Sequence, residues 1–168
     1  MTRNLLPIVF CATLAMQAPA LAGPRTAAIF DFELIDSSLE GELNGPRADE
    51  AARLSRLGEV LRRQLAASGR YAVIDIAPLA GEARASNLQA CGGCDTAFAR
   101  RLGAELAITG TVQKISNLIL HMSVYVRDAN SGRPIAEMSA DFRGNTDESW
   151  ARTLDWLIRN RLLALKTE

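Results

Sequence analysis

The order of three patterns in the first half of the sequence constrains the fold more than any other feature. In residues 26–35, apolar side chains alternate with polar ones, including Asp31 and Glu33, and this period of two predicts a strand buried on one face. In residues 49–68, leucines recur at helical spacing along one stripe. Residues 70–77 have a nearly continuous apolar centre, as in a strand buried on both faces. A strand, a helix and a strand in this order predict parallel pairing through a right-handed crossover.

The rest of the sequence adds one more strand of this kind, an antiparallel pair and two helices. The expected elements are a short helix over residues 95–103, strands over 106–115, 120–127 and 136–143, and a final helix that begins at Asn145 or Thr146. A turn signal, Asn130-Ser131-Gly132, separates the last two strands and predicts a meander. The order β-α-β-α-β-β-β-α therefore predicts an α/β (α+β) fold with a single mixed sheet covered by helices. The polar, glycine-containing residues 36–49 are expected to form a loop.

The first 22 residues have the features of an export signal. Arg3 provides a positive start, residues 5–16 form an apolar run, and Ala20-Leu21-Ala22 has the small-x-small pattern that signal peptidase reads. A lipoprotein anchored through Cys11 is the competing interpretation, but a bulky Phe10 precedes this cysteine where a small residue is needed. We predict cleavage after Ala22, a single globular domain over residues 23–168 without a transmembrane segment, and a periplasmic location.

The charge balance and the histidine content argue against several classes of function. The 19 basic and 19 acidic residues give a formal net charge of zero, whereas a nucleic-acid-binding domain normally carries a basic stripe. A single histidine leaves little room for a histidine-rich metal site. We therefore expect no nucleic-acid partner, no metal and no cofactor.

Cys91 and Cys94 form the sharpest motif, a Cys-Gly-Gly-Cys segment that directly precedes the predicted short helix. In an oxidising compartment this pair predicts a local structural disulfide. Thiol–disulfide exchange stays open, because a cysteine at a helix N-terminus has a stabilised thiolate. A haem attachment is ruled out because Asp95 follows where histidine is required, and a zinc site lacks further ligands.

Four carboxylates in and after the first predicted strand are candidate binding residues. Asp31 and Glu33 point the same way from that strand, about 7 Å apart. Such a pair could bind a cation or cleave a glycoside. Alternatively it could be a solvated edge, or it could pair with Arg127, Arg143 or an arginine of the first long helix. We favour the second interpretation because no aromatic run for sugar stacking accompanies the pair. Asp36 and Glu40 make the next loop acidic, so a calcium site is conceivable there, although the EF-hand spacing is missing.

His121, Tyr125 and Arg127 share one face of a predicted meander strand with Ser123. Together with Asp31 they invite a Ser–His–Asp interpretation. A serine in the middle of a strand, however, lacks the strained turn that exposes a nucleophile. The pattern therefore favours a solvent-exposed sheet face that has no catalytic role.

Two tryptophans lie on the final predicted helix. Trp150 belongs to its apolar stripe, and Trp156 lies near the edge of this stripe, where core packing is expected; an exposed Trp156 would be suited to anchor a partner. The candidate binding surface therefore combines polar side chains of the first strand, the acidic loop and the meander with this tryptophan: Asp31, Glu33, Asp36, Glu40, His121, Tyr125, Arg127 and Trp156. No catalytic residue is assigned.

Several segments resemble a group of bacterial envelope domains. Residues 69–75 (Gly-Arg-Tyr-Ala-Val-Ile-Asp) and 99–112, placed after an amphipathic helix, are similar to the amino-terminal domain of TolB and to CsgG and LpoB. Residues 30–34 and 143–150 resemble small secreted proteobacterial proteins of unknown function. These shared motifs are mainly structural, so they support the fold more than an activity.

The resemblance implies a non-enzymatic accessory or binding module of the periplasm. Such a module acts through contacts with another envelope or periplasmic protein, and relatives of this kind look like accessory factors for quinoprotein alcohol oxidation. Two alternatives remain open at this stage. One is a thiol–disulfide exchange protein that uses Cys91 and Cys94, and the other is a metal-binding accessory protein.

Overall fold

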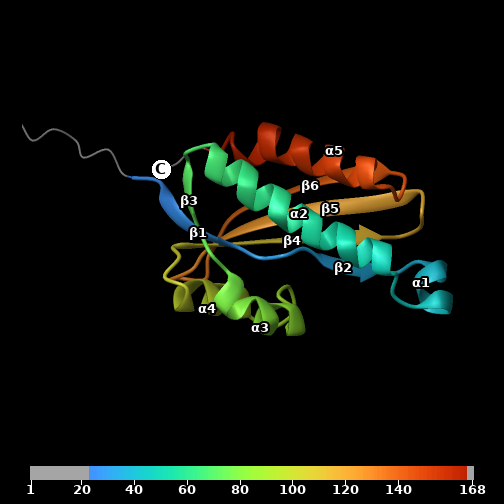
Figure 1. Cartoon of the computed structure of the whole chain (residues 1–168), viewed down its shortest axis with the longest axis horizontal. Helices are drawn as coiled ribbons and strands as arrows, with labels where there is room; N and C mark the ends of the chain where they lie inside the picture. Colours follow the sequence, from blue (N-terminus) through green and yellow to red (C-terminus); the bar gives the residue numbers. More distant parts are fainter. Residues whose placement is uncertain (1–22, 166–168) are drawn as a thin grey trace, which may run out of the picture.

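A computed structural model describes residues 23–165 of the chain (Figure 1). The predicted signal peptide lies outside the described residues. The strands are β1 (Arg25–Ile29), β2 (Glu33–Asp36), β3 (Tyr71–Ile74), β4 (Leu106–Lys114), β5 (Ile119–Asp128) and β6 (Pro134–Arg143). The helices are α1 (Leu39–Asn44), α2 (Ala48–Ala67), α3 (Ala80–Ala85), α4 (Cys94–Arg101) and α5 (Asp147–Leu157). No helix within residues 23–165 is long and apolar enough to cross a membrane.

The six strands in the described part of the chain form one mixed sheet, as predicted. Its order is β3-β1-β4-β5-β6, and β2 pairs with β4 beyond the end of β1. β1 pairs in parallel with β3 and with β4, which is the outcome expected for strands joined through helices. β4, β5 and β6 form the predicted antiparallel meander.

The order of elements differs from the prediction at two places. The strand expected over residues 26–35 is interrupted at residues 30–32, which gives β1 and β2. The stretch expected to be a loop contains α1, because the Ser38 side chain caps this helix by accepting a hydrogen bond from the Gly41 N–H. The variable stretch after β3 contains another short helix, α3.

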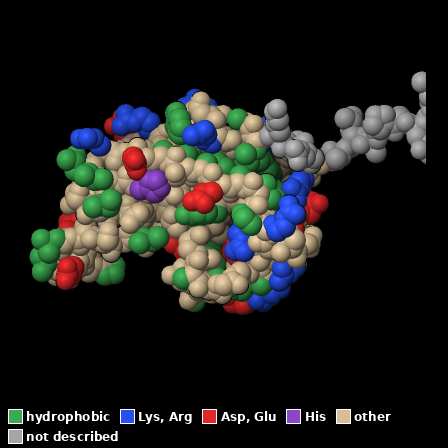
Figure 2. All heavy atoms as spheres, turned by 180° about the vertical axis from the view of Figure 1, so that it is seen from behind, with side chains coloured by type: hydrophobic (Ala, Val, Ile, Leu, Met, Phe, Trp, Pro, Cys, Tyr) green, Lys and Arg blue, Asp and Glu red, His purple; other side chains and the backbone are tan. Residues whose placement is uncertain are grey.

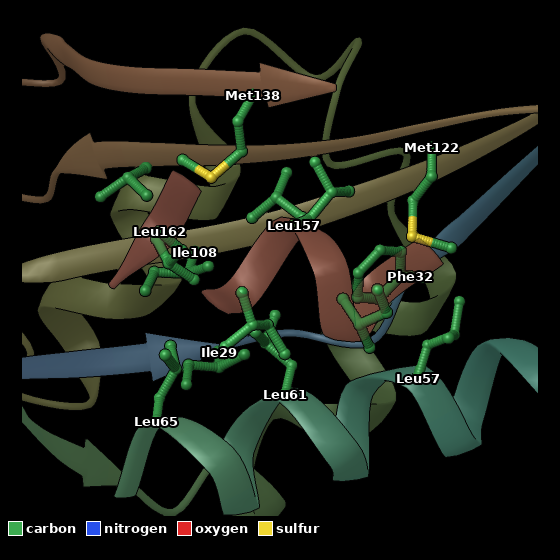
Figure 3. Packing of buried hydrophobic residues seen from close by; sticks show 14 of the residues in the cluster. Ile29, Phe32, Leu57, Leu61, Leu65, Ile108, Met122, Met138, Leu157 and Leu162 are labelled. Atoms are coloured by element: carbon green, nitrogen blue, oxygen red, sulfur yellow. The ribbon is translucent and has the colours of Figure 1, made fainter. Parts of the chain in front are cut away.

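Two hydrophobic clusters occupy opposite faces of the sheet. α2 and α5 cover one face, where Leu61 and Leu65 of α2 point toward Ile29 of β1 (Figure 3). The predicted core residue Trp150 is confirmed as a member of this cluster. α3 and α4 pack on the other face, around β1 and the first part of β4 (Figure 1). On the second face, the helices therefore cover β1 and the first part of β4 and leave the rest of the meander uncovered.

The interruption after β1 places two phenylalanines on opposite faces. Phe32 belongs to the cluster under α2, whereas Phe30 packs with Phe98 of α4. The expectation that Phe30 and Phe32 share one buried face is therefore wrong. Gly110 of β4 makes room for the Phe32 ring, since a β-carbon at this glycine would lie 2.3 Å from the ring atom Cε1.

Candidate binding surface

The uncovered part of the second sheet face carries a regular array of polar side chains. Because side chains alternate along a strand, every second residue of β4, β5 and β6 points away from α2 and α5. The strand registers align these residues into three rows: Gln113–His121–Asp141, Thr111–Ser123–Ser139 and Thr109–Tyr125–Glu137. We call these nine residues the open sheet face.

The open sheet face has a floor of small hydroxyl residues and a rim of larger polar ones. Thr109, Thr111 and Ser123 are buried among their neighbours, while Glu137 and Ser139 on the edge strand β6 are exposed. Figure 2 views the molecule from this side, where the histidine lies among largely uncharged atoms next to an acidic side chain. Such a surface offers many hydrogen-bonding groups and carries two exposed carboxylates, Glu137 and Asp141.

His121 has an acidic partner on the neighbouring strand. Its Nδ1 lies 2.6 Å from Oδ1 of Asp141, directly opposite in the register. The Ser–His–Asp arrangement with Asp31 is not formed, because Asp31 lies against α2, where Nη1 of Arg62 is 2.9 Å from its Oδ1. The pairing of Asp31 with an arginine of the first long helix is the alternative that the sequence favoured.

Asp31 and Glu33 have separate environments and do not act as a pair. Asp31 fits against α2 at Gly58, where a β-carbon would lie 2.5 Å from its Oδ1. Glu33 accepts a hydrogen bond from the Leu88 N–H at 2.6 Å. Burial raises the pKa of Glu33 above its usual value, although this backbone hydrogen bond opposes the shift. Neither carboxylate has the geometry of a glycosidase pair.

Arg127 is engaged inside the protein and contributes little to the open sheet face. Its Nη1 donates to both carboxylate oxygens of buried Asp95, at 3.0 and 3.2 Å, and its Nη2 donates to the Gly132 carbonyl at 2.8 Å. Arg127 thereby connects the β5–β6 turn with the first turn of α4. The sequence has no local signal for this role, because Asp95 and Arg127 lie 32 residues apart.

Cys91 and Cys94 are joined by a disulfide that closes the turn before α4. The Cys94 N–H also donates to Cys91 Sγ at 3.2 Å. The preceding loop lies against the open sheet face, since Nε2 of Gln89 donates to Oγ1 of Thr109 at 2.9 Å. The disulfide therefore fixes the start of α4 next to one border of this face.

Asp36 and Glu40 bind a buried lysine that the sequence interpretation missed. Nζ of Lys114, which is 0% exposed, lies 2.8 Å from Glu40, 2.7 Å from buried Glu50 and 3.4 Å from Asp36. Burial alone would lower the pKa of Lys114, but its hydrogen bonds to Glu40 and Glu50 outweigh burial and raise it. The hydrogen bond from Lys114 likewise lowers the pKa of Glu40.

This charge cluster uses the oxygens that a calcium ion would need. Within residues 23–165, no three His, Cys, Asp or Glu side chains are grouped so that they could hold a metal ion. A signal for the cluster was present in the sequence. Lys114 lies on the inward-facing side of its strand, the side that also carries Ile108 and Val112. A charged side chain at such a position requires a buried partner.

Trp156 is 44% exposed, so the expectation that it packs in the core is wrong. It lines a hollow of about 340 Å³ beside the edge strand, together with Ala140, Asp141, Arg152 and Thr153. The guanidinium of Arg161 lies 5.8 Å from its ring centroid. Through Asp141, this hollow adjoins the His121 row of the open sheet face.

Comparisons with known proteins agree with this architecture. The model of the family DUF3280, described as "Protein of unknown function (DUF2380)", matches residues 25–162. A comparison with curated proteins gives no match. Among solved structures, the fold is similar to the LpoB C-terminal domain from Salmonella enterica, with 15% identity, a TM-score of 0.50, and coverage of 75% of this chain and 87% of that chain.

The solution structure of LpoB from E. coli is also similar. It shares 14% identity with a TM-score of 0.51, and the match covers 85% of this chain and 80% of that chain. At such low identities, the similarity establishes a shared fold. The predicted resemblance to LpoB-like envelope domains is therefore confirmed at the level of the fold.

Proposed function

The chain belongs to the DUF3280 family, and from this premise we propose that it is a non-enzymatic accessory module that docks onto another protein of the cell envelope. The observation that carries the proposal is the open sheet face. Its three aligned rows of polar side chains face outward on a rigid meander, next to the exposed Trp156. Protein interfaces are enriched in aromatic residues and carry about one hydrogen bond per 100–200 Å² of buried area, and the open sheet face with Trp156 supplies both kinds of group.

The internal engagement of the ionisable groups supports binding over catalysis. Asp31, Asp36 and Glu40 are neutralised by buried or half-buried cations, and Arg127 is held by Asp95. These contacts stabilise the fold and leave the exposed side chains of the open sheet face, among them Glu137 and Ser139, available to a partner. The LpoB-like fold and the predicted signal peptide support a proposed action in the periplasm. We further propose a quinoprotein alcohol-oxidation system as a candidate partner.

Site-specific photo-crosslinking in cells tests this proposal. A photoreactive residue at Ser139 or Glu137, both exposed on the open sheet face, should capture the same single protein. The same residue at Arg63, exposed on α2 on the other side of the sheet, is the matched control. The proposal fails if Ser139 and Glu137 give no crosslinked protein beyond those captured from Arg63.

Thiol–disulfide exchange is the second candidate, because the exposed Cys91 is bonded to a cysteine at the N-terminus of α4. A helix N-terminus stabilises the thiolate of Cys94 when the disulfide is reduced. Catalysed reduction of insulin by the wild-type protein, abolished in a folded Cys91→Ser/Cys94→Ser variant, would establish this function and exclude the purely structural role of the disulfide.

A further inference from the structure

Helix α1 is oriented opposite to the usual amphipathic helix. Surface helices normally bury their apolar stripe and expose their polar side. In α1, Glu40 points to the buried Lys114, whereas Leu39 and Leu43, one turn apart, are 69% and 73% exposed. None of the six residues of α1 is buried. The helix therefore presents leucines to the exterior.

Specific contacts hold α1 in this orientation. Asp36 accepts hydrogen bonds from the N–H and the hydroxyl of Ser38, at 2.9 and 2.6 Å, and Ser38 in turn caps the helix. Arg47 donates to Glu40 at 2.9 Å from the other end. Since both ends and the inner side of α1 are fixed by these bonds, the exposure of its leucines is a defined feature of the fold.

The β4–β5 turn adds further apolar side chains at the same end of the molecule. Ile115, Leu118 and Ile119 are 50%, 57% and 49% exposed. Ser116 fixes this turn, because its Oγ accepts hydrogen bonds from the N–H groups of Leu118 and Ile119. Ile35 of β2, 47% exposed, pairs in register with Gln113, two residues before Ile115.

These side chains form one surface, which we call the apolar end: Ile35, Leu39, Leu43, Ile115, Leu118 and Ile119. Of the eight large hydrophobic side chains that are exposed in the described part of the chain, six belong to it. Figure 2 shows hydrophobic groups gathered at the end of the molecule that carries α1, away from the end where the chain emerges. Several exposed large apolar side chains at one end of a protein mark an interaction site. The apolar end continues the open sheet face, because Ile35 extends the row of Gln113 and His121.

The charges around the apolar end indicate the chemistry of its occupant. Residues 33–50 contain six acidic side chains and one basic one, Arg47. Lys114 binds three of these carboxylates from the inside, and the exposed Arg143 lies opposite Ile119 in the register, so acidic groups remain in excess. Anionic lipid headgroups and a second copy of the same end would both face like charge here, which is unfavourable. A partner with basic side chains around an apolar strip has complementary charge.

We propose that the apolar end binds an amphipathic helix of the partner protein, with Lys or Arg side chains directed toward the exposed Glu42 of α1. The apolar side of that helix covers Leu39, Leu43 and the β4–β5 turn. This inference rests on the proposed function, since it names the chemistry of the protein that the module docks onto.

Two synthetic helices of about 18 residues, long enough to be helical in water, serve as probes. Both have leucines along one side; one has lysines and the other glutamates on the opposite side. Fluorescence anisotropy at physiological salt should show binding of the lysine helix to the wild-type protein, and at least about tenfold weaker binding of the glutamate helix. Leu39→Ser/Leu43→Ser should weaken lysine-helix binding by at least about tenfold. Ile135→Ser, which removes an exposed apolar side chain far from α1, is the matched control and should leave binding unchanged.

Several results would overturn the inference. Equal binding of both helices would show that charge does not select the occupant. Unchanged binding after Leu39→Ser/Leu43→Ser would show that the apolar end is not the binding site. If the wild-type protein floats with phosphatidylcholine vesicles and the double variant does not, the apolar end binds a membrane. If the wild-type protein forms a concentration-dependent dimer and the double variant does not, the apolar end binds a second copy. If Ser139 crosslinks to a protein but the lysine helix does not bind, this inference alone is refuted. If Ser139 gives no crosslink and the lysine helix does not bind, the proposed function is refuted as well.

Discussion

Replacing Lys114 by methionine removes the cation on which α1 depends while keeping a side chain of similar length. Three carboxylates lose their partner, at 2.7, 2.8 and 3.4 Å from Nζ. Glu50 is 1% exposed and keeps the amide of Asn145 as a donor at 2.6 Å, whereas Glu40 and Asp36 can turn toward water. Removing one member of a buried ion pair costs about 3–5 kcal/mol, and with only one carboxylate fully buried we expect about 3 kcal/mol.

Thermal unfolding followed by circular dichroism measures this loss. For a chain of this size, about 3 kcal/mol corresponds to a decrease in Tm of roughly 6–12 °C. Hydrogen exchange should show that residues 39–44 lose protection before the sheet does, because α1 has no buried side chain of its own. Lys114→Met/Glu50→Gln should recover part of the Tm, since it removes the stranded buried charge. The reasoning is refuted if Lys114→Met lowers the Tm no more than Arg63→Met, which removes an exposed charge.

Three further perturbations test other parts of the structure. Burial raises the pKa of Glu33, so its charged form destabilises the folded state at pH values above the raised pKa. Glu33→Gln should therefore increase the Tm at pH 7. This increase should vanish as the pH falls toward 4.5. An unchanged or lower Tm at pH 7 would contradict this sign. Gly110→Ala places a β-carbon against the Phe32 ring and should cost about 1–3 kcal/mol in urea unfolding; a neutral effect would show that the ring moves freely. Cys91→Ser/Cys94→Ser opens a very small loop and should cost about 2 kcal/mol, with faster hydrogen exchange in residues 86–93; a larger loss would mean that the disulfide does more than close its turn.

Much of the fold could be predicted because its patterns are local and mutually consistent. The leucine stripe of α2 and the alternation in β5 and β6 each specify one element and its buried side. The break between β1 and β2 could not be predicted in this way. Phe30 and Phe32 both continue the alternation, with Asp31 between them as the pattern requires, so nothing in the sequence marks the change of face.

The candidate surface was predicted in part for the same reason. A turn between two alternating strands sets their register, so the placement of His121 and Tyr125 on one outward face follows from the sequence. The engagement of Arg127 by Asp95, 32 residues away, depends on the packing of α4 and has no local signal. The contact between Glu40 and Lys114 joins residues 74 apart, and it reverses the orientation that the amphipathic pattern of α1 alone would suggest.

That reversal has an energetic consequence that favours a functional role for the apolar end. Burying Lys114 requires its desolvation, and replacing a buried ion pair with well-packed hydrophobic side chains is often neutral or stabilising. A chain under selection for stability alone would bury Leu39 and Leu43 and leave Glu40 in water. The structure instead uses a fully buried cation to hold the carboxylate inside and the leucines outside. Departures of this kind from local rules concentrate at functional sites, and burial of the two leucines against a partner's helix would restore the usual distribution of apolar surface.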